Sequence, residues 1–242
     1  MLVLGIESSC DECSVAVVED GRRILSNVVL SQVESHALFQ GVVPEIASRM
    51  HTESILPVYR AALEEAGVTG GEIDGVAVTN RPGLSGSLVV GLTFGKAVAF
   101  ALDLPFIAVD HILAHNYAAQ LDRPIDYPHI TLLVSGGHSI IGEADAFDSF
   151  TVLGTTIDDA CGEAFDKVAT YLGVGYPGGV QIDRLARQGD PGAYRFPMPK
   201  LNKGDHRYDV SYSGLKTAVL HQVDQFHVKG KGSRIEDVAA SF

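Results

Sequence analysis

The chain has 242 residues, and its 46% hydrophobic and 20% charged content is that of a globular protein able to bury a core. Three cysteines are too few for a disulfide framework, and the formal charge of −12 argues against a surface that binds nucleic acid throughout. The most apolar window, residues 88–109, is interrupted by Lys96 and Asp103, and the N-terminus lacks the basic start of a signal peptide, so we expect a cytoplasmic protein with no membrane partner.

Along the first part of the chain, hydrophobic alternation and turn signals predict strands and helices in the order βββαβα, followed by a further short strand. Asp20-Gly21 is a tight hairpin signal between the second and third strands, and the first helix is expected between Pro44 and Gly67. The other predicted elements are strands at 2–8, 13–20, 22–30, 74–80 and 106–109 and a helix at 85–102.

The same order begins again in the second part. Two strands are predicted in 129–144, joined at Ser135-Gly136-Gly137, and a third at 150–156. An amphipathic helix is expected over 158–173, capped by Asp158 or Asp159 and ended by Gly173. The repeat predicts an α/β protein of two related lobes, 1–110 and 111–242. The second lobe is incomplete, and because the last residues read as helix interior we expect a truncated chain.

Charge is unevenly distributed along the sequence. Residues 1–80 hold 12 acidic and 4 basic side chains, whereas residues 184–234 hold 4 acidic and 10 basic ones, a local net charge of +6. Such a segment can receive phosphates even on an acidic protein, and it can equally be a solvated loop surface.

Two histidines four residues apart, His111 and His115, are a moderate signal for a metal site, because residues with this spacing share one face of a helix. A metalloprotease helix needs a glutamate directly after the first histidine, and Ile112 occupies that position. The protease interpretation is therefore excluded, while a structural role for the two histidines stays open.

Two turns at equivalent places in the two halves are candidate binding sites. The turn Val134–His138 offers consecutive backbone N–H groups that can hold a phosphate or carboxylate, although glycine pairs also occur in plain hairpins. Asp11 and Glu12 lie in the matching turn of the first half, as exposed carboxylates that can hold a cation, act as a base or simply be solvated.

Eight sequence motifs in order resemble the tRNA N6-adenosine threonylcarbamoyltransferase family across the whole chain: GIESSCDE, GVVPEIASR, PGLSGSLVVGLTFGK, the histidine pair, LLVSGGH, IDDACGEAFDK, YPGG and YSGLKT. The resemblance implies an actin-like, sugar-kinase-like fold. It also implies the reaction, in which threonylcarbamoyl-AMP donates its threonylcarbamoyl group to N6 of the adenosine beside the anticodon in tRNAs that read ANN codons.

The resemblance further implies the functional residues. His111 and His115 would bind one divalent metal, iron or zinc; Asp11 and Glu12 would assist the transfer; and the substrate would be bound by Val134, Ser135, Gly136, Gly137, His138, Asp166, Gly179 and Asp183. The implied partners are tRNA, a paralogous dimerisation subunit and a small ATPase subunit.

Two points limit what the resemblance implies for this chain. The family's later glycine-rich adenine-binding segment and its C-terminal metal-binding aspartate have no counterpart before Phe242.

A noncatalytic actin-like scaffold of the same modification complex is the alternative function, and the histidine pair argues against it. An ATP-dependent sugar or acyl kinase rests on the fold alone.

Overall fold

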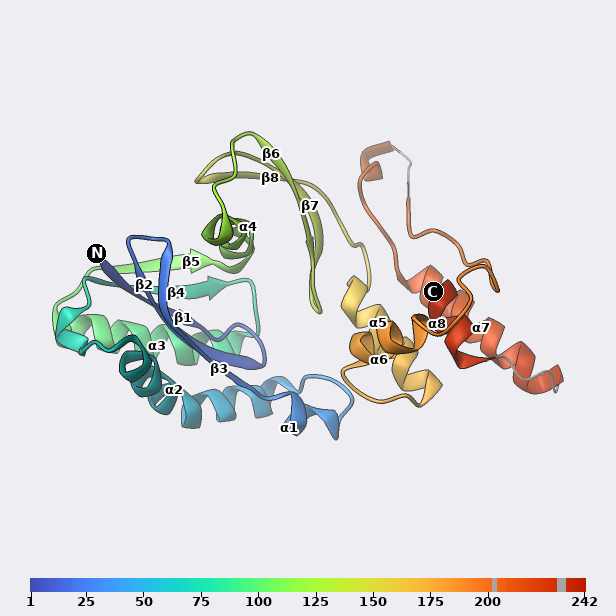
Figure 1. Cartoon of the computed structure of the whole chain (residues 1–242), viewed down its shortest axis with the longest axis horizontal. Helices are drawn as coiled ribbons and strands as arrows, with labels where there is room; N and C mark the ends of the chain where they lie inside the picture. The colour runs from blue at the N-terminus through green and yellow to red at the C-terminus, as the bar shows by residue number, and fades with distance from the viewer. Residues whose placement is uncertain (202–203, 230–233) are drawn as a thin grey trace. The chain divides into compact units, whose positions relative to one another are not determined.

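The computed structural model describes residues 1–201, 204–229 and 234–242. It divides into two compact units, Met1–Ile125 and Asp126–Phe242. A five-stranded sheet belongs to the first unit and a three-stranded sheet to the second (Figure 1). The boundary between the units follows helix α4 (His111–Asp122), whereas the sequence analysis placed it before that helix.

The sheet of the first unit has the order β3-β2-β1-β4-β5. Its first three strands are antiparallel, while β4 and β5 run parallel to β1. The predicted hairpin is confirmed, because both Asp20 and Gly21 have the positive φ angles, 52° and 71°, that its tight turn requires. The strands are β1 (Leu2–Glu7), β2 (Glu12–Glu19), β3 (Arg23–Ser31), β4 (Gly75–Arg81) and β5 (Phe106–Asp110).

Helices connect the parallel strands and cover the sheet (Figure 1). The predicted helix after Pro44 is α2 (Pro44–Ala66), and it ends at Gly67, whose φ of 69° closes the helix in the left-handed region. The other helices are α1 (Val33–Ala37), the short 3-10 turn η1 (Gly70–Glu72), α3 (Ser85–Leu102) and α4. Apolar side chains from β1, β2, β4 and α2 form the core, including Leu4, Val15, Val17, Ile55, Val58, Val76 and Val78.

Helix α3 is long and apolar enough to pass as a membrane-spanning helix by length and composition, although the sequence analysis predicted no span in this region. Two glycines of α3 are explained by the close packing of this helix against the sheet. A Cβ on Gly91 would collide with the Ser8 side chain, and one on Gly95 would collide with the Val78 side chain. These glycines therefore let α3 lie close against β1 and β4, as a helix of the protein core does.

The second unit repeats the antiparallel start of the first. Its strands pair in the order β6-β7-β8, so the three predicted strands are confirmed. Among the described residues of this unit no strand extends the sheet beyond β8, in keeping with an incomplete second lobe. The elements are β6 (His129–Val134), β7 (Ser139–Ala146), β8 (Ser149–Thr155), α5 (Cys161–Leu172), α6 (Gly178–Ala186), η2 (Gly204–His206), α7 (Ser213–Lys229) and α8 (Ile235–Ser241).

The predicted cap of helix α5 is wrong. The helix is stopped by Gly173 as expected, but it begins at Cys161 and not at residue 158, and neither Asp158 nor Asp159 caps it. Instead the side chain of Glu163 accepts a hydrogen bond from the N–H of Ala160. Asp158 accepts hydrogen bonds from the backbone at the start of α7 and from a nearby serine. The capping rules used on the sequence consider only the next helix along the chain, whereas Asp158 accepts hydrogen bonds at the start of α7, more than fifty residues later.

Candidate functional site

The predicted metal ligands His111 and His115 lie at the start of α4. Strand β5 ends at Asp110, whose carboxylate accepts hydrogen bonds from the N–H groups of Ile112 (2.9 Å) and Leu113 (3.3 Å) and so caps the helix. With the helix fixed at this point, the two histidines are one turn apart on the same face. Their Nε2 atoms are 3.1 Å apart, and their rings meet edge to face with centroids 4.5 Å apart.

This separation fits two ligands of one ion. Two nitrogen ligands that each lie about 2.0 to 2.1 Å from a tetrahedral zinc ion are about 3.3 Å apart, close to the observed distance between the Nε2 atoms. Within the described ranges, no group of three His, Cys, Asp or Glu side chains that could hold a metal ion is found. If the histidines bind an ion, this unit would supply two protein ligands, and the remaining coordination positions would fall to water, substrate or other groups.

A carboxylate that the sequence analysis did not select lies beside this pair. Glu7, the last residue of β1, has its Oε2 atom 3.1 Å from Nδ1 of His111 and 2.6 Å from the hydroxyl of Thr79. Its Oε1 atom accepts a hydrogen bond from the N–H of Ser9. Burial raises the pKa of Glu7, but the hydrogen bonds from His111, Ser9 and Thr79 outweigh this effect and lower the pKa to about 2.

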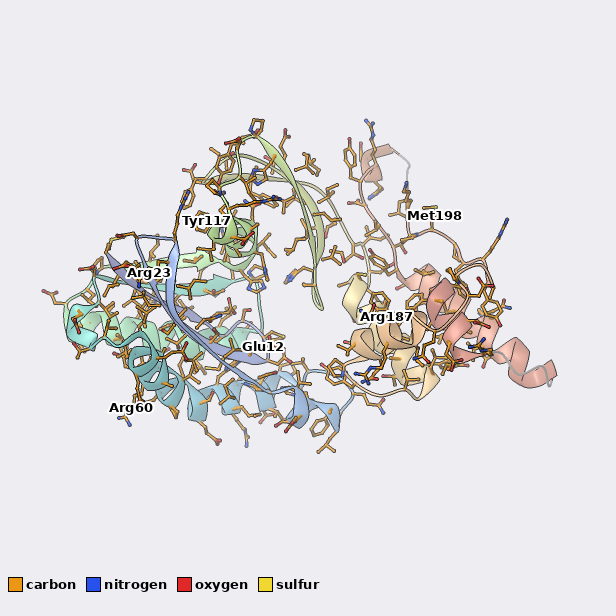
Figure 2. The ribbon with its side chains drawn as sticks, viewed as in Figure 1. Glu12, Arg23, Arg60, Tyr117, Arg187 and Met198 are labelled. Atoms are coloured by element: carbon orange, nitrogen blue, oxygen red, sulfur yellow. The ribbon has the colours of Figure 1, made fainter. Side chains whose placement is uncertain are left out.

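The turn between β1 and β2 carries Asp11 and Glu12, the residues predicted to assist transfer. The Asp11 carbonyl accepts a hydrogen bond from the N–H of Gln32 (3.0 Å), and Glu12 begins β2 with an exposed side chain (Figure 2). Partial burial raises the pKa of Glu12, and so do the negative charges of Asp11 and Glu7. A carboxylate whose pKa is raised is a stronger base when it is ionised, which suits Glu12 to accepting a proton.

A buried polar network supports this turn from below. Nε2 of His51 lies 2.9 Å from the carbonyl oxygen of Cys10, and Nδ1 of His51 lies 3.5 Å from the amide nitrogen of Gln32. The Gln32 oxygen lies 3.2 Å from Nε2 of His36, and Nδ1 of His36 accepts a hydrogen bond from the N–H of Val43. His36, His51 and Gln32 are each at most 1% exposed. This network was not predicted from the sequence, because Gln32 and His36 belong to α1 and its cap, whereas His51 belongs to α2.

In the second unit, the predicted substrate turn Val134–His138 joins β6 to β7. Two of its N–H groups are used within the turn, because Ser135 donates to the carbonyl of His138 (2.8 Å) and His138 donates to the hydroxyl of Ser135 (3.1 Å). At Gly136 and Gly137 an added Cβ would meet no described atom within 4 Å. A ligand therefore has room to approach the glycine pair.

Helix α5 packs tightly against the same turn. The N–H of Gly162 donates to the carbonyl of Ser135 (3.2 Å), and a Cβ on Gly162 would lie 2.6 Å from Cα of Gly136. Only a glycine at this position allows the start of the helix to approach the backbone of the turn so closely. The conformation of the turn is therefore set by the helix as well as by its own hydrogen bonds.

The other predicted substrate residues lie where α5 meets α6. The Asp166 carboxylate accepts a hydrogen bond from the N–H of Gly178 (2.7 Å) and so joins the two helices. Gly179 and Asp183 follow on α6, four residues apart and on one helical face. Asp183 forms an exposed ion pair with Arg187 (2.7 Å). The structure thus brings Asp166 and the start of α6 together, with Asp183 one turn further along.

Two aspartates link the IDDACGEAFDK and YSGLKT motifs. The Asp159 carboxylate accepts hydrogen bonds from the ammonium groups of Lys167 (2.6 Å) and Lys216 (2.5 Å). Burial raises the pKa of Asp159, but the two lysines outweigh it and hold the pKa below its usual value. Asp158 accepts from the N–H groups of Tyr212 (2.9 Å) and Ser213 (3.2 Å) at the start of α7.

Comparison with known proteins agrees with the family named by the motifs. A family model described as tRNA N6-adenosine threonylcarbamoyltransferase matches residues 23–242. Curated proteins of that name match the whole chain: one from Treponema denticola is 60% identical, one from Treponema pallidum 54% and one from Borrelia hermsii 52%. The chain spans 72%, 69% and 71% of their respective lengths. These names do not favour the noncatalytic scaffold.

Solved structures support the predicted fold class. The chain is similar over its whole length to component A of (R)-2-hydroxyglutaryl-CoA dehydratase from Acidaminococcus fermentans, with a TM-score of 0.54, 14% identity and 73% of that chain covered. The activator of 2-hydroxyisocaproyl-CoA dehydratase from Clostridium difficile gives a TM-score of 0.52 at 13% identity, with 100% of this chain and 70% of that chain covered. The fold is of the actin-like, sugar-kinase-like class; likeness at this level of identity concerns the fold alone.

Proposed function

The chain belongs to the tRNA N6-adenosine threonylcarbamoyltransferase family, and we propose that it transfers the threonylcarbamoyl group of threonylcarbamoyl-AMP to N6 of the adenosine beside the anticodon. Family membership gives the acyl transfer to tRNA. The specific reaction is supported above all by the 3.1 Å distance between the Nε2 atoms of His111 and His115, which suits one iron or zinc ion.

The reaction requires an activated carbonyl, a held phosphate and a base. The N6 amine forms a bond to the carbamoyl carbon, the bond from that carbon to the phosphate oxygen breaks, and AMP leaves with the electron pair. When bound, the metal supplies Lewis acidity to such a carbonyl. The amine must lose one proton, and we assign its acceptance to Glu12, whose pKa is raised by partial burial and by the neighbouring carboxylates.

We assign donor binding to the predicted residues of the second unit. The N–H groups of Gly136 and Gly137, above which the space is open, suit a phosphate or carboxylate group. Ser135 and His138 hold the shape of the turn through their mutual hydrogen bonds. Asp166, Gly179 and Asp183 would contact the adenosine portion, since Asp166 fixes the start of α6, which carries the other two.

The partners proposed for this chain are tRNA, a paralogous dimerisation subunit and a small ATPase subunit, and we place the reaction in the cytoplasm. The basic stretch of residues 184–234 is the part of the chain proposed to receive tRNA phosphates. Lys200 and Arg207 belong to it, while Lys203 lies outside the described residues. Arg207 lies over the ring of Tyr208, 5.2 Å from its centroid, an arrangement also suited to stacking on a base.

The proposal is tested by incubating the chain with tRNA, threonylcarbamoyl-AMP and the two partner proteins, and by measuring modified adenosine by mass spectrometry. We expect modification with the parent chain and its loss in His111→Ala and His115→Ala. Metal analysis after dialysis against a mild chelator should show less iron or zinc in both variants than in the parent. Equal metal content in all three proteins would show that His111 and His115 are not metal ligands.

A matched pair of glycine variants tests the binding turn. Gly137→Ala places its Cβ in open space, so the fold should remain intact while the affinity for threonylcarbamoyl-AMP falls. Gly162→Ala presses on the backbone of the turn instead and should lower stability as well. An unchanged affinity in Gly137→Ala would remove the glycine pair from the donor site.

A further inference from the structure

Glu7 is a partly buried carboxylate next to the histidine pair, and its side chain is held in place by two groups besides the histidine. The N–H of Ser9 donates to Oε1, and the hydroxyl of Thr79 donates to Oε2 at 2.6 Å. The side chain of Glu7 is 34% exposed and that of His111 only 19% exposed, so their contact is largely shielded from water. The carboxylate is thus fixed before any ligand binds.

The hydrogen bonds around Glu7 determine the proton position on His111, because both carboxylate oxygens act as acceptors, Oε1 from the N–H of Ser9 and Oε2 from the hydroxyl of Thr79. A carboxylate can only accept hydrogen bonds, and its Oε2 atom lies 3.1 Å from Nδ1 of the histidine. The proton of this contact belongs to Nδ1. The hydroxyl of Ser9, 3.3 Å from the same nitrogen, can accept as well as donate and is compatible with this assignment. A neutral imidazole that carries its proton on Nδ1 has a lone pair on Nε2, which is the atom that faces His115 at 3.1 Å.

We propose that Glu7 is the positioning residue of the histidine pair: it holds His111 in the Nδ1–H form and so directs the Nε2 lone pair toward the divalent ion. The proposal rests on the metal site of the proposed function. Carboxylates that accept from the outer nitrogen of a metal-binding histidine orient the ring and increase its basicity, and their loss typically lowers metal affinity about 10- to 100-fold.

Glu7→Gln should do more than remove a charge, because an NH2 donor then replaces one of the two oxygen acceptors, at either the Oε1 or the Oε2 position. At the Oε1 position the NH2 would face the backbone N–H of Ser9, a fixed donor. At the Oε2 position it would face the hydroxyl of Thr79, which can rotate to accept, and Nδ1 of His111, which can accept once the proton moves to Nε2. The second arrangement is favoured, and it places a proton on the nitrogen that binds metal.

The experiment measures the tautomer and the metal separately. Ring ¹⁵N shifts of metal-free protein in alkaline buffer, assigned by comparison with His111→Gln, should show Nδ1–H for the parent and Nε2–H for Glu7→Gln. Competition with a chromophoric chelator for Zn²⁺ should show zinc affinity about 10- to 100-fold lower in Glu7→Gln. Glu7→Asp, which keeps a carboxylate on a shorter side chain, should retain the Nδ1–H form and part of the affinity.

Thr79→Val is the matched control. It removes a hydrogen bond to Glu7 but keeps the carboxylate, so the Nδ1–H form of His111 should remain. Parent protein in the Nε2–H form, or an unchanged tautomer and zinc affinity in Glu7→Gln, would overturn the proposal. A tautomer that inverts in Glu7→Gln while the parent binds no zinc would instead overturn the metal site of the proposed function and leave the role of Glu7 in orienting His111 in place.

Discussion

Replacing His51 by leucine should loosen the turn that carries Asp11 and Glu12. His51 is fully buried, and its Nε2 atom is 2.9 Å from the carbonyl oxygen of Cys10, the residue before the turn's carboxylates. A leucine of similar size fills the space but donates no hydrogen bond. The Cys10 carbonyl and the amide nitrogen of Gln32 then each lose a partner in the interior.

The expected loss can be estimated from the bonds involved. A buried polar group left without a partner costs about 1 to 3 kcal/mol. The Cys10 contact is short and counts in full, whereas the contact to Gln32 is 3.5 Å long and counts little, since the Gln32 nitrogen also lies 3.4 Å from the carbonyl of Ala47. His51→Leu should therefore lower the free energy of unfolding by about 1 to 3 kcal/mol.

His51→Gln is the matched comparison, because its amide NH2 can still donate to the Cys10 carbonyl while its size stays close to that of histidine. Urea denaturation followed by circular dichroism gives the change in unfolding free energy, and the transfer assay reports on the turn. We expect His51→Gln to recover most of the stability and activity lost in His51→Leu. Equal losses in the two variants would show that ring packing, and not the hydrogen bond to Cys10, supports the turn.

Three further predictions concern the second unit. Asp159→Asn should lower the free energy of unfolding at neutral pH by about 1.5 to 3 kcal/mol. Because folding lowers the pKa of Asp159, this stabilisation is present above the usual pKa of an aspartate and is lost as the pH falls through the lower pKa of the folded state. Unfolding curves of parent and variant should therefore converge in acid. Gly162→Ala should cost about 1 to 3 kcal/mol in thermal or urea unfolding, since its Cβ would press on the backbone of Gly136, and a stable variant would refute the close approach. Reversing the charges of Lys200 and Arg207 should weaken tRNA binding and lower the slope of log affinity against log salt by roughly 0.7 to 0.9 per lost phosphate contact. An unchanged slope would show that these residues form a solvated surface that does not contact tRNA.

The features predicted correctly from the sequence are those decided by neighbouring residues. Asp20-Gly21 specified its hairpin because both positions need positive φ, and Pro44 and Gly67 marked the ends of α2 because one residue fixes φ at a helix start and the other tolerates the left-handed region at a helix end. The placement of His111 and His115 on one face of a helix was predicted for the same reason, since a spacing of four is a local property of a helix.

The features that the sequence analysis missed depend on residues distant in the chain. Asp158 was assigned as a cap of the helix that follows it, yet its partners are Tyr212 and Ser213. Glu7 lies within the GIESSCDE motif but was not selected as a site residue, because its partner Thr79 lies on a strand that becomes its neighbour only through a parallel crossover. Sequence periodicity identifies such strands but not their pairing register, and the register decides which side chains meet.

The register of the parallel strands explains why these groups gather at one edge of the first sheet. Ile6 pairs with Val78, and Val78 pairs with Ala108, so the carboxyl ends of β1, β4 and β5 end side by side. Glu7 and Thr79 are the next positions along β1 and β4, and Asp110, the cap of α4, is the last residue of β5. Ligands of open α/β sheets bind at this edge. Two carboxylates from this edge then bear on His111: Asp110 caps the helix that carries it, and Glu7, by our proposal, fixes which ring nitrogen carries the proton. The contact between Glu7 and His111, on which the proposed metal site depends, therefore exists only through this pairing of strands.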